Sequence, residues 1–387
     1  MSEDLLRFQP PAVTELAPDR PVDVASVRSP SYGKYIEEFV EGTTFKHPRE
    51  FTLFPSFVQE FATTFLETNP IYLSEPFAQA HGYRTLPATP LMVLTLGLSL
   101  SVQTDSEKAV ANLGYYHVRF VRPVYAGDTL HGESTVLSRR LRGAGKPGVV
   151  RVRTRTFNQA DELVLQYERT IMIRSHGGPA VEGGAPPPPP EPPELLIPRA
   201  HGPYPAGRTG ETTYFEDFEV GDIIAHANGR TISEEHFAWT YRLGNTHPLH
   251  YDRIYSGGQE GPMSGEPIVA GPYVFAWLVG LASRDTTENS LWELGFHEGY
   301  HTQPSVAGDT VYAMSRVIDK QEGPAGLDAG IVTIQLLGVK NIRGIDAIER
   351  YGADLFVKES SKAAAGRPKI PEKIFEIERQ VLIKRRP

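Results

Sequence analysis

The chain of 387 residues contains no cysteine. It can therefore form no disulfide framework and offers neither a thiol nucleophile nor a cysteine metal ligand, and a cytoplasmic location is the default expectation. The sequence is also poor in basic runs, since the net charge is −8 and the one Lys/Arg-rich stretch is Lys384–Arg386. A nucleic-acid partner is therefore not expected.

A long hydrophobic run is missing as well. The N-terminal stretch Met1–Phe8 is acidic and has no apolar core, unlike a signal peptide. The longest apolar stretch, Leu86–Val102, contains two prolines and is too short to span a bilayer. We therefore expect a buried helix there and no membrane partner. Residues 1–30 lack helical periodicity and predict an extended or partly disordered arm.

The most informative feature that is present is an internal repeat with a spacing of about 180 residues. Four pairs of segments carry it: Tyr35–Phe39 with Tyr214–Phe218, Phe61–Tyr72 with Trp239–His250, Pro87–Pro90 with Val269–Pro272, and Pro123–Thr129 with Pro304–Thr310. Together with a length about twice that of a typical domain, the repeat predicts two copies of one domain. We place the first copy at 31–176 and the second at 200–387.

The segment between the copies, 177–199, is rich in proline, with Pro186–Pro190 followed by Pro192–Pro193. Proline at this density prevents a helix or a central strand and favours a semi-rigid polyproline spacer. A tether between two domains is the preferred interpretation, and an SH3-type ligand is the alternative.

Each copy shows the same order of predicted elements. An opening strand, a short helix and a polar loop precede a long apolar helix, at 91–102 in the first copy and 273–282 in the second. Strands follow, and Val149–Phe157 alternates with the period of two that a half-exposed strand requires. The closing strands are predicted at 163–173 and 374–383, with an insertion at about 342–372 in the second copy.

The polar loop Tyr241–Asp252 of the second copy presents His250, and a neutral imidazole is the usual general base near pH 7. At the positions of His250 and Asn245 the first copy has Tyr72 and Glu67. A tyrosine with a pKa near 10 is a poor base, so the sequence predicts one working site, in the second copy.

This loop, together with Glu266–Tyr273, resembles the signature of the MaoC-like (R)-specific enoyl-CoA hydratases, in which Gly-Asp-x-Asn-Pro is followed by an aliphatic residue and histidine. The matching residues are Gly244, Pro248, Leu249 and His250, whereas Asn245 and His247 replace the family's aspartate and asparagine. The resemblance implies an α+β double hot-dog fold, with two antiparallel sheets paired edge to edge and each wrapping a long helix. It also implies an acyl-CoA substrate and no separate cofactor.

The same resemblance assigns roles to individual residues. His250 and Asn245 are the expected catalytic residues, and the N–H of Gly271 is expected to bind the thioester carbonyl. Free N–H groups at a helix N-terminus can stabilise the enolate oxygen that forms when water adds to an enoyl thioester. The residues near the motif that could bind substrate are Tyr241, Arg242 and His247, and no metal site is expected.

Within the family, the tandem layout, the Asn245-Thr246 pair and the two Gly-Asp-Thr turns are most similar to mesaconyl-CoA hydratases. These enzymes reversibly hydrate a branched C4-dicarboxylic enoyl-CoA to β-methylmalyl-CoA. A hydratase of another (R)-3-hydroxyacyl-CoA, a hot-dog thioesterase and a non-catalytic acyl-CoA binding protein are the alternatives. The predicted helix 273–282 contains none of the carboxylates that a thioesterase would use. We expect a homo-oligomer.

One further motif, His297-Glu-Gly-Tyr-His301, fits the H-E-x-x-H pattern of zinc proteases. That pattern requires a helix, so that both histidines share one face. The repeat places the segment in a strand, where residues four apart are separated by roughly 13 Å. We therefore do not interpret the motif as a zinc site.

Overall fold

The computed structural model describes residues 6–12, 21–200, 202–205 and 207–387. It divides into a short N-terminal unit, Met1–Tyr32, and a compact unit, Gly33–Pro387. Within the described residues of the first unit, the one regular element is the 3₁₀ turn η1 (Val24–Ser26). The rest of the predicted arm, 1–5 and 13–20, lies outside the described residues. No helix in the described part of the chain is long and apolar enough to cross a membrane.

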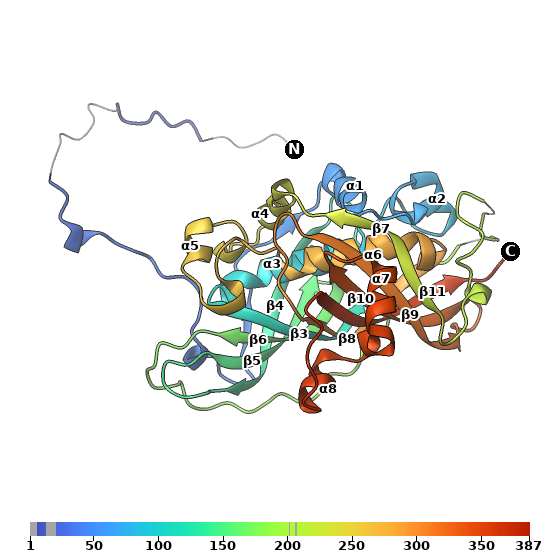
Figure 1. The fold of residues 1–387 in the computed structure, drawn as a ribbon. Coiled ribbons are helices and arrows are strands. Elements are labelled where there is room, and N and C mark those ends of the chain that lie inside the picture. Colours follow the sequence, from blue (N-terminus) through green and yellow to red (C-terminus); the bar gives the residue numbers. More distant parts are fainter. Residues whose placement is uncertain (1–5, 13–20, 201, 206) are drawn as a thin grey trace. The chain divides into compact units, whose positions relative to one another are not determined.

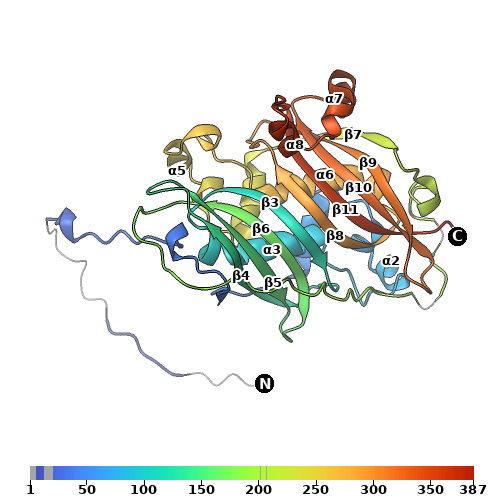
Figure 2. The ribbon, with the colours of Figure 1, turned by 90° about the horizontal axis from the view of Figure 1, so that it is seen from below.

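One antiparallel sheet of eleven strands forms the framework of the compact unit (Figures 1 and 2). The first half supplies β1 (Thr44–Lys46), β2 (Phe51–Thr52), β3 (Ala109–Phe120), β4 (Thr129–Arg140), β5 (Gly148–Phe157) and β6 (Leu163–Ile173). The second half supplies β7 (Ile223–Thr231), β8 (Ser290–His301), β9 (Thr310–Glu322), β10 (Ala329–Lys340) and β11 (Lys373–Lys384). The strands predicted at 149–157, 163–173 and 374–383 are thus confirmed as β5, β6 and β11.

The two halves join where β3 pairs with β8. The strand order is β1-β4-β5-β6-β3-β8-β11-β10-β9-β7, with β2 beside β4. At the junction, Tyr115 is opposite Gly299 and Val118 is opposite Phe296. Each half therefore covers one edge strand of the other, which removes two edges that would otherwise be exposed.

A long helix packs against the sheet in each half (Figure 2). These are α3 (Pro90–Ser101), which continues into a π-helical turn at Val102–Ser106, and α6 (Gly271–Thr286). All of residues 91–101 are buried, as expected for a helix that is apolar on every side. The chain thus contains two copies of one helix packed against an antiparallel sheet, which confirms the predicted α+β double hot-dog fold.

Shorter helices complete the unit. They are α1 (Pro55–Thr64), α2 (Glu75–Ala80), α4 (Ala238–Arg242), α5 (Arg253–Gly257), α7 (Gly344–Tyr351) and α8 (Glu359–Ala364). The 3₁₀ turns are η2 (Ile36–Glu38), η3 (Pro70–Tyr72), η5 (Phe215–Asp217), η6 (Glu234–Phe237), η7 (Pro248–His250), η8 (Gly261–Met263) and η9 (Gly352–Phe356). The elements α7, η9 and α8 lie in the segment 342–372, where the sequence indicated an insertion.

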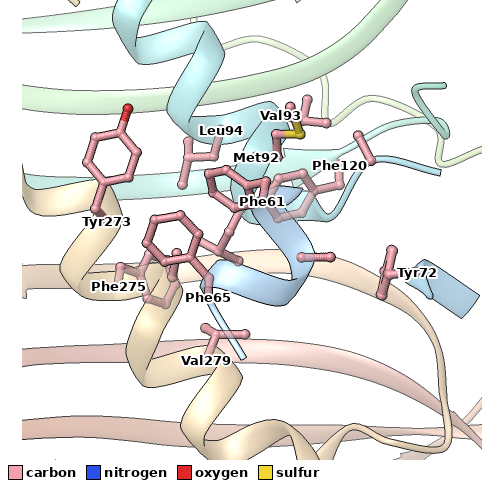
Figure 3. Close-up of a cluster of buried hydrophobic side chains, with 14 of the residues drawn as sticks. Phe61, Phe65, Tyr72, Met92, Val93, Leu94, Phe120, Tyr273, Phe275 and Val279 are labelled. Carbon is pink, nitrogen blue, oxygen red and sulfur yellow. The ribbon is translucent and has the colours of Figure 1, made fainter. Parts of the chain in front are cut away.

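The largest hydrophobic cluster is shared by both halves (Figure 3). The ring of Phe65, which follows α1 of the first half, lies 5.7 Å from the ring of Tyr273 and 5.2 Å from that of Trp277, both on α6. Aromatic pairs at such distances stabilise a core beyond the area they bury. The two halves therefore do not have separate interiors, and folding of one depends on the other.

Buried polar networks at equivalent places confirm the repeat. Each joins a histidine, a serine and an aspartate: His47, Ser134 and Asp105 in the first half, and His226, Ser315 and Asp285 in the second. The histidine–serine contact is 3.0 Å in the first half and 2.9 Å in the second. Both serines are buried, so each network ties the end of its long helix to the sheet.

Candidate active site

His250 lies at the end of η7, where the polar loop approaches the N-terminus of α6. Its Nδ1 atom is 3.0 Å from the carbonyl oxygen of Ile268. A carbonyl can only accept a hydrogen bond, so Nδ1 carries the proton and Nε2 holds a free lone pair. No hydrogen-bond partner for Nε2 is found among the described residues. Burial lowers the pKa of His250 to about 4, so the ring is neutral at pH 7.

The turn before His250 is held by Gly244 and Asn245. Gly244 has a φ of 78°, in the left-handed region that glycine adopts without strain. Its carbonyl oxygen accepts a 2.5 Å hydrogen bond from Arg49 of the first half. The Oδ1 atom of Asn245 accepts from the N–H of His247 at 2.9 Å. The amide nitrogen of the Asn245 side chain has no acceptor among the described residues, so it is free to donate a hydrogen bond.

His247 is a structural residue of this loop. Its Nδ1 accepts from the N–H of Leu249 at 3.2 Å, and its Nε2 donates to the carbonyl of Ala109 at 3.1 Å. The matching residue of the first half, Asn69, likewise accepts from a backbone N–H two residues ahead and donates to the carbonyl of Ser290. Both ring nitrogens of His247 are therefore occupied, although the sequence made it a substrate-binding candidate.

Gly271 is the first residue of α6, and the N-terminus of this helix is uncapped. The N-cap residue is Ala270, which has no side-chain acceptor, and the Gly271 N–H has no acceptor among the described residues. In the first half the corresponding helix is capped, because the hydroxyl of Thr89 accepts from the N–H of Met92 at 3.2 Å. The positive end of the helix dipole is thus available for a ligand only in the second half.

The imidazole of His301, on β8, lies against the backbone of Gly271. A Cβ atom at position 271 would be 2.3 Å from Nε2 of His301, so a side chain there would displace the ring. The same Nε2 is 3.2 Å from the hydroxyl of Tyr115, a buried residue of β3 in the first half. Burial lowers the pKa of His301 to about 4. Both halves therefore contribute polar groups next to Gly271.

Tyr241 and Arg242, the other two candidates, lie at the surface. Tyr241 is 58% exposed and lines an open cleft of about 550 Å³ together with Tyr251, Arg253 and Pro267. Tyr251 follows His250 and Pro267 precedes Ile268, so the cleft adjoins the loop that holds the base. The guanidinium of Arg242 is instead 5.6 Å from the Trp239 ring and 4.0 Å from Glu60 of the first half.

The equivalent site of the first half is filled. Its residues enclose a cavity of about 20 Å³, which is room for about one water molecule. Tyr72 replaces the histidine and is buried, with its pKa raised by burial (Figure 3). The neighbouring Glu67 uses Oε1 to accept from the backbone N–H groups of Thr68 and Asn69. The histidine base of the second half is therefore absent here, and the site has little room for a ligand.

The comparison with known proteins agrees with this architecture. The sequence profile described as mesaconyl-CoA hydratase matches residues 21–191 and 206–361. The chain belongs to the mesaconyl-CoA hydratase family. It is 33% identical over 316 residues to the β-methylmalyl-CoA dehydratase of Chloroflexus aurantiacus, covering 80% of this chain and 89% of the relative. It is 32% identical to the mesaconyl-CoA hydratase of Cereibacter sphaeroides, with 80% and 90% covered.

Solved structures show the same fold over most of the chain. A MaoC domain dehydratase of Chloroflexus aurantiacus superimposes with a TM-score of 0.77 at 29% identity, covering 92% of this chain and 98% of the other. A protein of Mycobacterium tuberculosis described as a double hot-dog gives a TM-score of 0.66 at 21% identity, with 90% and 98% covered.

Sequence reasoning considered His301 only as part of a zinc pattern and overlooked Tyr115 and Asn112. A signal was available in the repeat. The repeat matches His301 with Phe120 and Tyr115 with Phe296, so the polar pair stands at the site of His250 and the apolar pair at the site of Tyr72.

Proposed function

We propose that the chain reversibly hydrates a short, branched or dicarboxylic enoyl-CoA thioester, as the mesaconyl-CoA hydratases do, at one site in its second half. The observation that carries this proposal is the juxtaposition of a neutral histidine with a free Nε2 and an uncapped helix N-terminus. The hydro-lyase chemistry requires a base for water and a stabilised oxyanion, and these two features supply one each.

In the proposed reaction, Nε2 of His250 removes a proton from a bound water, whose oxygen attacks the β-carbon of the enoyl group. The electrons of the double bond move to the thioester oxygen, and the N–H of Gly271 and the α6 dipole stabilise that enolate. The proton held by His250 is then delivered to the α-carbon, which completes the addition of water. Asn245 cannot accept a proton and instead orients the water with its side-chain N–H.

The open cleft beside the loop suits the coenzyme A part of the substrate. Phe237, Tyr241 and Tyr251 offer aromatic surface for the pantetheine chain. Arg253 contributes positive charge, but its guanidinium is paired with Glu234 at 3.2 Å and Glu266 at 2.9 Å. We propose that this cleft holds pantetheine rather than the phosphates of coenzyme A.

Incubation with mesaconyl-CoA tests the proposal. Loss of enoyl absorbance without release of free thiol is the expected result. Release of thiol would indicate a thioesterase, and neither change would indicate a protein that only binds acyl-CoA. Crotonyl-CoA and decenoyl-CoA in parallel test the substrate class, because a preference for decenoyl-CoA would favour a fatty-acid hydratase.

A further inference from the structure

The two halves differ in polarity next to the first turn of their long helices. Beside α6, His301 lies against Gly271, and its Nε2 contacts the hydroxyl of Tyr115 from the first half. At the equivalent place beside the other long helix, the matching residues are Phe120 of the first half and Phe296 of the second, whose rings pack edge to face at 5.3 Å. Because the backbone is repeated, an apolar pair evidently fits this place. The polar pair is therefore not required by the fold and calls for a functional explanation.

A second difference concerns a buried carboxylate. In the filled site of the first half, Glu293 is buried and its Oε2 accepts from Arg379 at 3.2 Å. The repeat pairs Glu293 with Asn112 and Arg379 with Arg169. In the second-half site an amide therefore replaces the carboxylate at this position, although the arginine remains.

The groups left at that position are suited to an anion. The side-chain NH2 of Asn112 can donate to an anion, whereas its buried Oδ1 atom, which has no partner among the described residues, can only accept. Burial raises the pKa of Tyr115, so its hydroxyl keeps its proton and can donate a hydrogen bond. Arg169 is engaged with Asp105 at 2.5 Å, but its Nε atom has no acceptor among the described residues. A carboxylate can accept from this N–H, whereas an apolar acyl tail would leave it unpaired, at a cost in affinity.

We propose that His301 and Tyr115, supported by Asn112, form a subsite that binds the distal carboxylate of a dicarboxylic acyl group. The inference rests on the proposed function and deepens it, because it names the groups that select the substrate. In this view the substrate carboxylate takes the place that Glu293 fills in the first half. The hydroxyl of Tyr115 and a ring N–H of His301 donate to it, while the N–H of Gly271 remains for the thioester oxygen.

The variants His301→Phe and Tyr115→Phe test the subsite, since phenylalanine stands at both matching positions of the repeat, Phe120 and Phe296. Steady-state kinetics with mesaconyl-CoA and with crotonyl-CoA, which has no distal carboxylate, separate binding from chemistry. We expect each variant to raise the KM for mesaconyl-CoA about tenfold to a hundredfold, the range for lost hydrogen bonds to a charged group. The KM and kcat for crotonyl-CoA should change less than about threefold.

His297→Phe is the matched control, because His297 lies on the same strand but is exposed. It should leave the ratio of the two kcat/KM values unchanged. Equal losses with both substrates in His301→Phe and Tyr115→Phe would overturn the proposal and make the pair part of the general machinery. Should His301→Phe fold poorly, Tyr115→Phe, which removes a single oxygen atom, gives the answer alone.

Binding of saturated analogues provides a readout that does not depend on turnover. Methylsuccinyl-CoA should bind the wild-type protein more tightly than butyryl-CoA in calorimetry, and Tyr115→Phe should abolish most of that difference. A wild-type protein that shows the difference in binding but hydrates neither enoyl-CoA would refute the proposed function while supporting the subsite. Equal binding of both analogues by the wild type would refute the subsite even if hydration occurs.

Discussion

The Nδ1 atom of His250 lies 3.0 Å from the carbonyl oxygen of Ile268, and this contact decides which ring nitrogen can act as a base. Ile268 belongs to the segment that leads into α6, so one hydrogen bond fixes both the tautomer of the base and its position relative to the helix N-terminus. The first half has no such pair, because Tyr72 replaces the histidine.

The pH dependence of the reaction follows from this environment. Burial lowers the pKa of His250 to about 4, and the protonated ring cannot accept a proton from water. We therefore expect kcat/KM to fall only as the pH approaches 4, well below the 6.5 of an ordinary histidine. A carboxylate base would also make kcat/KM fall near this pH, so the apparent pKa of the acidic limb of the pH profile should be measured at several temperatures. The apparent pKa of an imidazole should change markedly with temperature, whereas an apparent pKa that does not change would point to a carboxylate.

Gly271→Ala should impair turnover without unfolding the protein. The new Cβ would be 2.3 Å from Nε2 of His301, so the ring or the helix N-terminus must move. Loss of a positioned oxyanion donor typically reduces kcat by about a hundredfold to a thousandfold. Gly257→Ala is the control, because a Cβ there meets no atom within 4 Å. Normal kcat in Gly271→Ala would contradict the role of this amide.

Asn245→Ala should reduce kcat/KM by about tenfold to a thousandfold, and less than removal of His250, because Asn245 positions the loop and the water rather than taking a proton. The Oδ1 contact to the His247 N–H at 2.9 Å would be lost. Glu67→Gln changes the matching residue of the filled first-half site and should leave most activity. If Glu67→Gln were as damaging as His250→Ala with the fold intact, the two halves would share one site.

The folded protein should lose stability as the pH falls below about 6.5. Burial lowers the pKa to about 4 for four histidines and to about 3 for one: His47, His81, His250, His301 and, lowest, His247. The unfolded chain binds protons at these sites before the folded chain does, so the free energy of unfolding decreases from pH 6.5 towards pH 4. Burial also lowers the pKa of His117 and His236, whereas it raises the pKa of Glu67 and Glu293, which opposes the trend.

Denaturant unfolding at pH 7.5 and pH 5.5 measures this effect. Each buried histidine can change the free energy of unfolding by at most about 1.4 kcal/mol per pH unit. His301→Phe removes one such group and should make the free energy of unfolding depend less steeply on pH. A free energy of unfolding that is the same at both pH values would contradict the burial of these rings.

The double hot-dog could be predicted because the repeat is visible as sequence. Alternation of apolar residues located β5 within one residue of its start, and the helix at Gly271 was signalled by Gly-Pro before an apolar run. The bounds of α6 were less accurate, since the helix continues from the predicted end at 282 to Thr286. Ser283 and Thr286 of its last turn are buried by tertiary packing, which local pattern does not report.

The residues around Gly271 were only partly predictable. His250 stands in a motif, but Tyr115 and His301 come from β3 and β8, which meet only because the two halves pair edge to edge. The sequence could not predict that both ring nitrogens of His247 form hydrogen bonds, since one of the partners is Ala109 of the other half. Local sequence specifies the loop, whereas the contacts of its side chains depend on the pairing of the halves.

The central claim is that one of two equivalent sites works and that His250 is its base. The most direct test is kcat/KM for hydration of mesaconyl-CoA by His250→Ala and Tyr72→Phe, both verified to be folded. We expect kcat/KM of His250→Ala to fall by about a hundredfold to ten-thousandfold, which is the contribution of a general base. Tyr72→Phe should keep most of the wild-type value. Equal losses in the two variants, or full activity in His250→Ala, would contradict the account.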